Sequence, residues 1–273
     1  MPILLGLLAS LLIGMSDFLG ARSAGRTTAL QTTTAAFLGG GVAALLYSPL
    51  LGDPSFEDIA LGALSGVALA IALTTLWRAY ALSSIGVAAP IAAVVSTVLP
   101  VLYGAARGEM PGVLGWLGIA VGVVALFLTS WQPVGDPSRV GVTLGLVSGL
   151  FFSGMYIIAI STSDEAGTWP IVPQRLTAFV LAITAALVTR QRPFAGGSAT
   201  RVSLLAGVFG ASGVAAVVYG GQRGPIAPVV VAGSMYPAVA IALAWVFMGQ
   251  VLTPRQILGV IGALLGVALM SLD

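Results

Sequence analysis

The chain has 273 residues, of which 58% are hydrophobic and only 7% are charged, and its formal net charge is +2. A soluble domain carries about 25% charged residues, so this composition excludes a soluble globular protein and indicates a membrane protein. Cysteine and histidine are absent and every basic residue is an arginine, which excludes disulfides, Cys/His metal or haem sites and a Walker A lysine. We therefore expect no metal, no cofactor and, because the arginines are scattered, no nucleic-acid partner.

Apolar stretches of about 20 residues, each long enough to cross a lipid bilayer, recur along the whole chain. The loops between them are short, which favours one compact bundle. The predicted fold class is an all-α membrane protein with ten transmembrane helices, at residues 2–21, 31–50, 58–82, 87–106, 112–131, 140–160, 170–189, 203–221, 228–248 and 255–271.

The first span contains a carboxylate, Asp17, in the stretch "LLIGMSDFLG" (11–20). A charged side chain inside a bilayer is costly unless it is paired, hydrated or protonated. Asp17 is therefore either a cavity residue that contacts a substrate or carries a proton, or a structural acid that is paired or reaches water at the helix end. The sequence leaves both interpretations open.

Arg78 lies near the end of the third span, in "TTLWRAYALSS" (74–84). The first and third spans run in the same direction, so Arg78 and Asp17 lie toward the same side of the membrane. We predict that Arg78 pairs with Asp17 or with an anionic substrate group. Gln31 and Thr34, which begin the second span on that side, complete this predicted polar cluster. The alternative for Arg78 is a side chain that reaches out to the lipid headgroups.

Two spans carry a proline in their interior, at Pro100 and Pro237. Each proline removes one backbone hydrogen bond and clashes with the carbonyl four residues earlier. Broken helices in corresponding spans indicate a substrate site near the midplane, and a packing kink is the alternative. The residues beside these kinks that we predict to line a cavity are Ser96, Ser234 and Tyr236.

Several aromatic side chains are further candidates for the cavity wall, although each such ring more commonly packs inside a bundle or anchors in lipid. They are Trp77, Tyr103, Tyr156 and Tyr219. Arg175 lies in the seventh span, about 8 Å inside the opposite boundary of the bilayer. We expect Arg175 to extend to the headgroups, with an anion-binding site as the alternative.

The sequence contains an internal repeat. Glycines occur at relative positions 0, 3 and 7 in both "GWLGIAVGVVAL", from Gly115, and "GVIGALLGVALM", from Gly259. The preceding spans also correspond, as "PIAAVVSTVLPVL" (90–102) and "PVVVAGSMYPAV" (228–239). Because each repeat holds five spans, an odd number, the second copy must insert upside down. The predicted domains are a first repeat at 1–131, a linker at 132–139 and a second repeat at 140–273.

The arginines are distributed unevenly between the two sides of the predicted bundle. Three lie toward one side (Arg107, Arg175 and Arg223), and eight lie toward the other (Arg22, Arg26, Arg78, Arg139, Arg190, Arg192, Arg201 and Arg255). Because cytoplasmic loops are enriched in basic residues, this distribution predicts that the arginine-rich side is cytoplasmic and that both termini face out.

The phrases "SDFLG", "AAPIAAVVSTVLPVL", "GSMYPAV" and "GALLGVAL", in this order over the whole chain, resemble the EamA-type branch of the drug/metabolite transporter superfamily. The resemblance implies a secondary transporter, commonly an exporter of metabolites, amino acids or drugs, with a cavity between its halves and no bound cofactor. It also implies termini in the cytoplasm, against the arginine count. The chain departs from the family at Gln250, where a glutamate is frequent, and at "QTTT" (31–34), where an arginine is common.

We therefore predict a non-enzymatic secondary transporter, an exporter of a small organic metabolite or drug, in the bacterial inner (plasma) membrane. It would work by alternating access. A lipid-carrier flippase and a non-transporting assembly protein are the alternatives, whereas a passive channel would need a continuous polar stripe that the spans lack. The small residues of the fifth and tenth spans allow close helix contact, which leaves both a monomer and a homodimer open.

Overall fold

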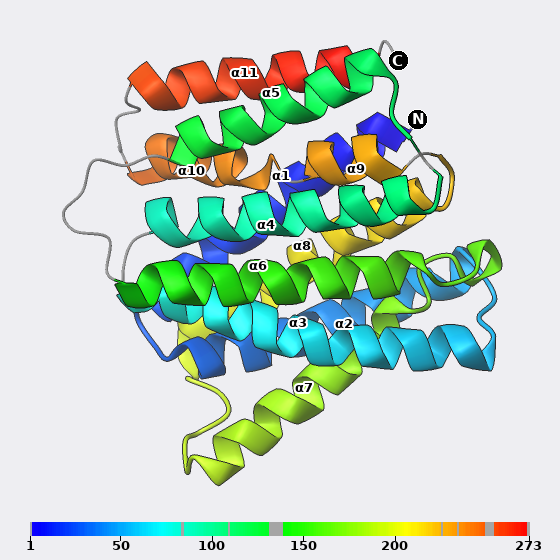
Figure 1. The fold of residues 1–273 in the computed structure, drawn as a ribbon. Coiled ribbons are helices and arrows are strands. Elements are labelled where there is room, and N and C mark those ends of the chain that lie inside the picture. Colours follow the sequence, from blue (N-terminus) through cyan, green and yellow to red (C-terminus); the bar gives the residue numbers. More distant parts are fainter. Residues whose placement is uncertain are drawn as a thin grey trace.

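The computed structural model describes residues 2–82, 85–108, 110–130, 139–224, 226–233, 235–248 and 254–271, and most of them are helical (Figure 1). Ser234 and nearly all of the predicted linker lie outside the described residues. The helices are α1 (Pro2–Ala24), α2 (Ala29–Tyr47), η1 (Ser48–Leu50), α3 (Phe56–Leu82), α4 (Ile85–Ala106), α5 (Val113–Ser130), α6 (Arg139–Ile160), η2 (Asp164–Ala166), α7 (Ile171–Val188), α8 (Gly197–Gly221), α9 (Ile226–Gly233), α10 (Tyr236–Met248) and α11 (Pro254–Ser271).

Six of the described helices are long and apolar enough to cross a membrane, judged by length and composition. They are α1, α2 with the turn that follows it, α3, α6, α7 and α8. Three of the other predicted spans coincide with α4, α5 and α11, and α9 and α10 together occupy the fourth. Large apolar side chains such as Leu4, Leu64 and Leu176 are exposed on the outer faces of their helices, as expected for a surface that lipid covers.

The span predicted at 228–248 is divided in two. α9 ends at Gly233 and α10 begins at Tyr236. Pro237 is the second residue of α10, where a missing N–H is tolerated, and in a continuous helix its ring would clash with the carbonyl of Gly233. Pro100 differs, because it lies inside α4, which is continuous from Ile85 to Ala106.

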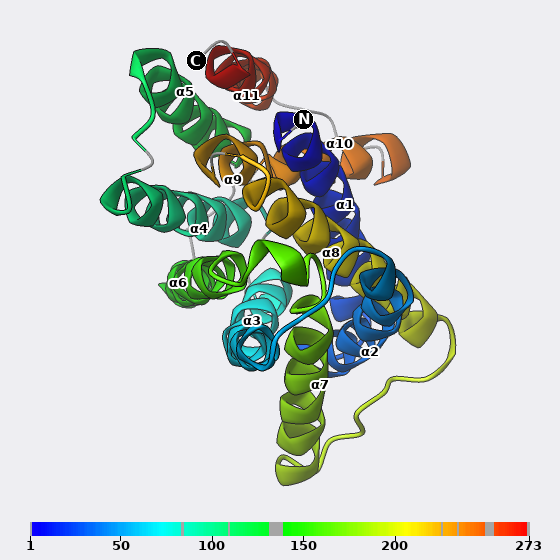
Figure 2. The ribbon, with the colours of Figure 1, turned by 90° about the vertical axis from the view of Figure 1, so that its right-hand side faces the viewer.

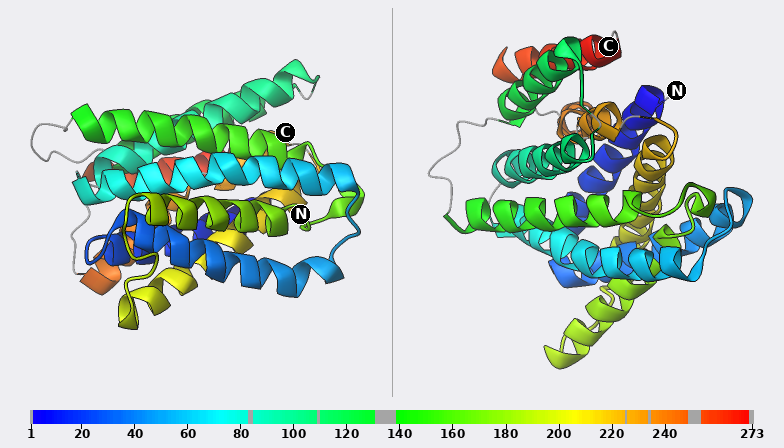
Figure 3. Two further views of the ribbon diagram at one scale, coloured as in Figure 1. Left: turned by 90° about the horizontal axis from the view of Figure 1, so that it is seen from below. Right: turned by 45° about the vertical axis from the view of Figure 1, so that its right-hand side comes forward.

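Helices from the two ends of the chain interleave (Figure 2). α1 packs mainly on α8, α9 and α10, while α3 packs on α6 and α7, and α2 lies between α7 and α8. α5 and α11 pack on each other at one edge of the bundle, and α7 diverges from the opposite edge (Figures 1 and 2). The beginning of α1 and the end of α11 lie at the same end of the bundle, and Figure 3 shows both from two further directions.

Glycines allow close contacts between helices, and two of them show how. A Cβ on Gly207 of α8 would overlap the carbonyl oxygen of Ala36 on α2, and a Cβ on Gly66 of α3 would overlap that of Gln174 on α7. Backbones can approach this closely only where one partner has no side chain. The positions of α2 and α7 against the centre of the bundle therefore depend on these two glycines.

One end of the bundle is joined by a buried carboxylate. Asp58, in the first turn of α3, accepts hydrogen bonds from the backbone N–H (2.9 Å) and hydroxyl (2.7 Å) of Ser55. It also accepts bonds from the backbone N–H (2.7 Å) and hydroxyl (2.9 Å) of Ser163, which follows α6. The backbone N–H of Asp53 donates to the carbonyl of Glu165 at 2.8 Å. These bonds fix the α2–α3 connection to the α6–α7 connection.

The opposite end of the bundle, where α1 ends and α8 begins (Figure 1), is joined by hydroxyl groups. The Oγ atoms of Ser23, at the end of α1, and Ser203, on α8, are 2.7 Å apart. Thr32 of α2 donates to Ser23 Oγ at 3.5 Å. Each of these three groups is an uncharged alcohol, so this end is held without a charged partner.

Candidate functional site

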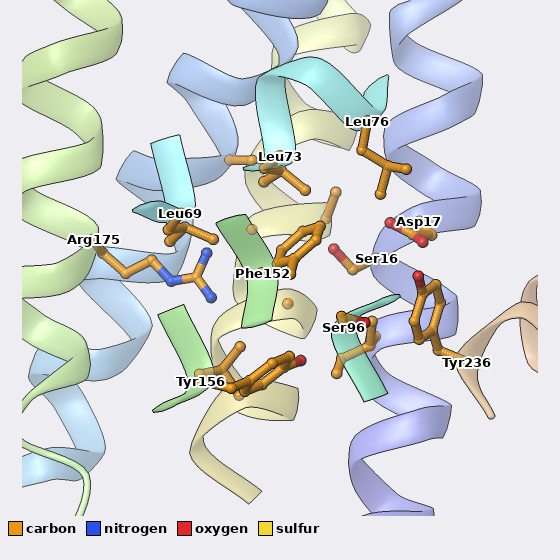
Figure 4. Close-up of a pocket in the computed structure, with 16 residues that line it drawn as sticks. Ser16, Asp17, Leu69, Leu73, Leu76, Ser96, Phe152, Tyr156, Arg175 and Tyr236 are labelled. Carbon is orange, nitrogen blue, oxygen red and sulfur yellow. The ribbon is translucent and has the colours of Figure 1, made fainter. Parts of the chain in front are cut away.

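A cavity lies between α1, α2, α3, α4, α6, α7, α8 and α10 (Figure 4). The cavity volume open to water is about 40 Å³, which is enough for a few water molecules. Its apolar wall is formed by Ile13, Ala36, Leu69, Leu73, Leu76, Phe152, Ala206, Gly207, Gly210 and Val214. Its polar lining consists of Ser16, Asp17, Ser96, Tyr156, Arg175 and Tyr236.

Asp17 is 5% exposed and is held by two side chains of α3. Trp77 Nε1 donates to one carboxylate oxygen at 3.3 Å, and the Tyr80 hydroxyl donates to the other at 3.1 Å. Trp77 and Tyr80 are three residues apart, so they share one face of the helix. Both donors are neutral, and they leave the charge of Asp17 uncompensated at the cavity wall.

The predicted pair of Asp17 with Arg78 is not found, and this prediction is corrected. The Arg78 side chain is exposed. Arg78 follows Trp77 directly, and one residue corresponds to about 100° of rotation around a helix. The face of α3 that meets Asp17 therefore carries Trp77 and Tyr80, and Arg78 points away from the cavity.

Arg175 is also placed differently from the expectation. Instead of reaching the headgroups, it is 2% exposed, and it lines the cavity from α7. Its Nε atom has no hydrogen-bond partner. The close contact between Gly66 and the neighbouring Gln174 backbone draws this turn of α7 into the bundle, which explains why the side chain turns inward.

Three further predicted residues line the cavity. Ser96 of α4 donates to the carbonyl of Ala93 at 3.1 Å, and Tyr236 of α10 donates to that of Ala89 at 3.5 Å. Tyr156 of α6 contributes its ring and hydroxyl to the wall. These residues come from helices far apart in the sequence, and the fold brings them to one site.

The polar residues predicted at the start of the second span do not line the cavity. Gln31 forms a capping box with Thr28, in which each side chain bonds the backbone N–H of the other. Thr34 is buried and donates to the carbonyl of Leu30 at 2.7 Å. Both side chains stabilise the first turns of α2, and the structure gives them no contact with Asp17 among the described residues.

Two predicted aromatic residues lie away from the cavity. The Tyr103 ring is 5.7 Å from the guanidinium carbon of Arg107, and the Tyr219 ring is 4.2 Å from that of Arg223. These are cation–π contacts near helix ends. Trp77 was predicted to line the cavity, but it lies outside the lining and donates a hydrogen bond to Asp17.

The sequence analysis missed Ser16, Tyr80 and Phe152. Ser16 and Phe152 line the cavity, and Tyr80 bonds Asp17. Phe152 lies four residues before Tyr156, and this spacing places both on the same face of α6. That spacing is the signal that could have identified Phe152 from the sequence.

The two charged residues of the site lie on opposite walls of the cavity (Figure 4). Asp17 projects from α1, and the Arg175 guanidinium points inward from α7 on the other side. In the part of the chain that the structure describes, no group of three acidic side chains is arranged to hold a metal ion. The cavity lining itself offers charged groups, hydrogen-bonding groups and apolar surface.

Comparisons with known proteins agree with this architecture. Residues 139–272 match the EamA-like transporter family. A solved structure named "Crystal structure of protein" is similar over 99% of this chain and 96% of its own length, with a TM-score of 0.77 and 15% identity. The second half of the chain is therefore EamA-like. Six of the described helices are apolar and long enough to cross a membrane, and the match is to a transporter family. This EamA-like protein is therefore an integral, multi-pass membrane protein.

At 15% identity, the likeness of the EamA-like protein to the solved structure shows a shared fold alone. A comparison with curated proteins gives no match.

Proposed function

We propose that this EamA-like protein is a secondary transporter that exports a small organic solute across a bacterial plasma membrane. The observation that carries the proposal is the cavity, an apolar site with a few polar groups and a buried acid, Asp17. Small-molecule sites commonly have this composition. The cavity is lined from helices on both sides of the predicted linker, so a relative movement of the two repeats would change its shape.

The pattern of helix contacts supports an inverted repeat of five helices in each half. The contact of α1 with α8 corresponds to the contact of α6 with α3. The contact of α2 with α8 corresponds in the same way to that of α7 with α3. α1 packs on α9 and α10 as α6 packs on α4. Exchanging α1–α5 with α6–α11 therefore maps these contacts onto one another, as expected for repeats that bind solute at their interface.

The size of the cavity supports alternating access. A space that holds a few waters is too small for a metabolite, so the helices must separate before a solute can enter. Each end of the bundle is held by hydrogen bonds between the two repeats, and these bonds would open in turn. The arginine-rich end would face the cytoplasm, and the outward direction rests on the family.

Asp17→Asn tests the role of the acid, because it removes the charge and keeps the size of the side chain. Arg78→Gln is the matched control, since Arg78 is exposed. In proteoliposomes offered amino acids, purine-like compounds and cationic drugs, wild type and Arg78→Gln should move a solute equally. Asp17→Asn should be at least about tenfold slower, the loss of about 1.4 kcal/mol of stabilisation. Equal flux through Asp17→Asn would remove Asp17 from the mechanism.

Thiol labelling separates a transporter from an assembly protein without a known solute. The chain has no cysteine, so a single introduced cysteine reports its own environment. We expect Ser96→Cys, at the cavity, to react with a small water-soluble thiol reagent. Ser148→Cys is the control and should not react, because Ser148 is fully buried where α6 meets α3. An unreactive Ser96→Cys would favour the assembly protein.

A further inference from the structure

Arg175 brings a positive charge into the membrane-spanning part of the fold without an anion to balance it. Its side chain is 2% exposed, its guanidinium points into the cavity (Figure 4), and its Nε has no hydrogen-bond partner. An arginine does not lose its proton in a protein, and a buried charge without a partner is strongly destabilising. Among the described residues, Arg175 therefore has no acceptor with negative charge beside it.

Two polar neighbours of Arg175 are also donors. They are the phenol groups of Tyr47 and Tyr156, which are neutral at physiological pH. The Tyr47 hydroxyl is itself buried and has no hydrogen-bond partner. The Arg175 guanidinium, at one wall of the cavity, and the nearby Tyr47 phenol both lack an acceptor among the described residues. Such donors match the hydrogen-bonding needs of an oxyanion.

Asp17 cannot supply this anion. Among the described residues it is the only acid that lines the cavity, and it lies on the opposite wall (Figure 4). Its two oxygens already accept bonds from Trp77 and Tyr80. Among the described residues no acid supplies the anion that Arg175 lacks, which leaves a bound solute as its source.

We propose that Arg175 binds the single oxyanion of the transported solute, a carboxylate or a group of the same shape and charge. This inference rests on the transport function proposed above. Leu69, Leu73 and Phe152 line the space between the two charged walls, so the body of the solute is apolar. A second anionic group would approach Asp17 and be repelled, which selects a monoanion or a zwitterion over a dianion.

Formate is a suitable probe because it is an oxyanion small enough for a cavity that holds a few waters. The full-length protein in detergent is heated with sodium formate, or with sodium chloride plus formamide, the neutral analogue, at equal ionic strength. A ligand that binds only the folded state raises Tm. We expect wild type and Arg78→Gln to gain about 5 °C when formate exceeds its Kd about 100-fold.

Arg175→Gln should show no response to formate, and Arg175→Lys should keep a smaller one because it keeps the charge. Without formate, Arg175→Gln should unfold at a higher temperature than wild type, since it removes an unpaired buried charge. An equal formate response in wild type and Arg175→Gln, or no response in wild type, would overturn the proposal. The measurement does not depend on transport. A formate response in a protein that shows no flux would contradict the proposed transport function only. Flux without a formate response would contradict only the proposed role of Arg175.

Discussion

The two ends of the bundle are held together by different chemistry. Where α6 meets α3, one carboxylate, Asp58, accepts two bonds from Ser163 and two from Ser55. Where α1 meets α8, the contacts are neutral: the hydroxyl of Ser23 bonds the hydroxyl of Ser203 and the carbonyl of Ala199. Hydrogen bonds to a charged group are roughly twice as strong as neutral ones. If the protein works by the proposed alternating access, we therefore expect the Ser23 end to separate at the lower cost.

The largest effect should come from preventing that opening. The Oγ atoms of Ser23 and Ser203 are 2.7 Å apart, which places the two side chains within reach of a disulfide. We expect the double variant Ser23→Cys/Ser203→Cys to lose nearly all flux in proteoliposomes after oxidation and to regain it after reduction. The single variant Ser23→Cys is the control. Undiminished flux through the cross-linked protein would mean that this end does not open.

The next effect concerns the stability of the Asp58 end. Asp58→Ala leaves the backbone N–H groups of Ser55 and Ser163 without their acceptor. We expect the free energy of unfolding to fall by about 3 kcal/mol, measured as a lower midpoint of unfolding in detergent. The exposed neighbour Glu57 provides the control, and Glu57→Ala should change it by less than about 0.5 kcal/mol. Equal losses of stability from Asp58→Ala and Glu57→Ala would show that the hydrogen bonds of Asp58 do not strengthen this end of the bundle.

The smallest effect should come from the alcohol pair. Ser23→Ala removes the bond to Ser203, whose hydroxyl still donates to the carbonyl of Ala199 at 2.9 Å. We expect a loss of about 1 kcal/mol in the same unfolding measurement. Ser10→Ala is the control, because Ser10 bonds only the carbonyl of Leu7 within α1, and it should cost less. A loss as large as that of Asp58→Ala would abolish the difference between the ends.

Hydropathy was sufficient to predict where the helices lie, because each apolar stretch must satisfy its backbone internally in a membrane. The division of 228–248 into α9 and α10 was within reach, since Pro237 excludes a regular helix at Gly233. The same argument applied to Pro100 predicts a break that α4 does not have. A proline fixes which bond is lost, and the neighbouring helices decide whether the helix continues.

The rotation of each helix was beyond the sequence. One turn of α3 contains Trp77, Arg78 and Tyr80, and their order in the sequence gives no indication of which side chains face α1. The inward turn of Arg175 likewise depends on the contact of its helix with Gly66. Asp58 and Ser163 are 105 positions apart in the chain, and the sequence around neither residue predicts their contact. Polar contacts within the bundle therefore had to be read from the packed helices.

The pairing of α5 with α11 has a consequence for biosynthesis. The main partner of α5 is the last helix of the chain, so α5 enters the membrane long before α11 exists. At a translation rate of about 5–20 residues per second, the wait is on the order of 10 s. During that time the small-residue face of α5 is free to contact lipid, the insertion machinery or another nascent chain. The surface that α5 presents is thus covered only once the 18-residue helix α11 has been made.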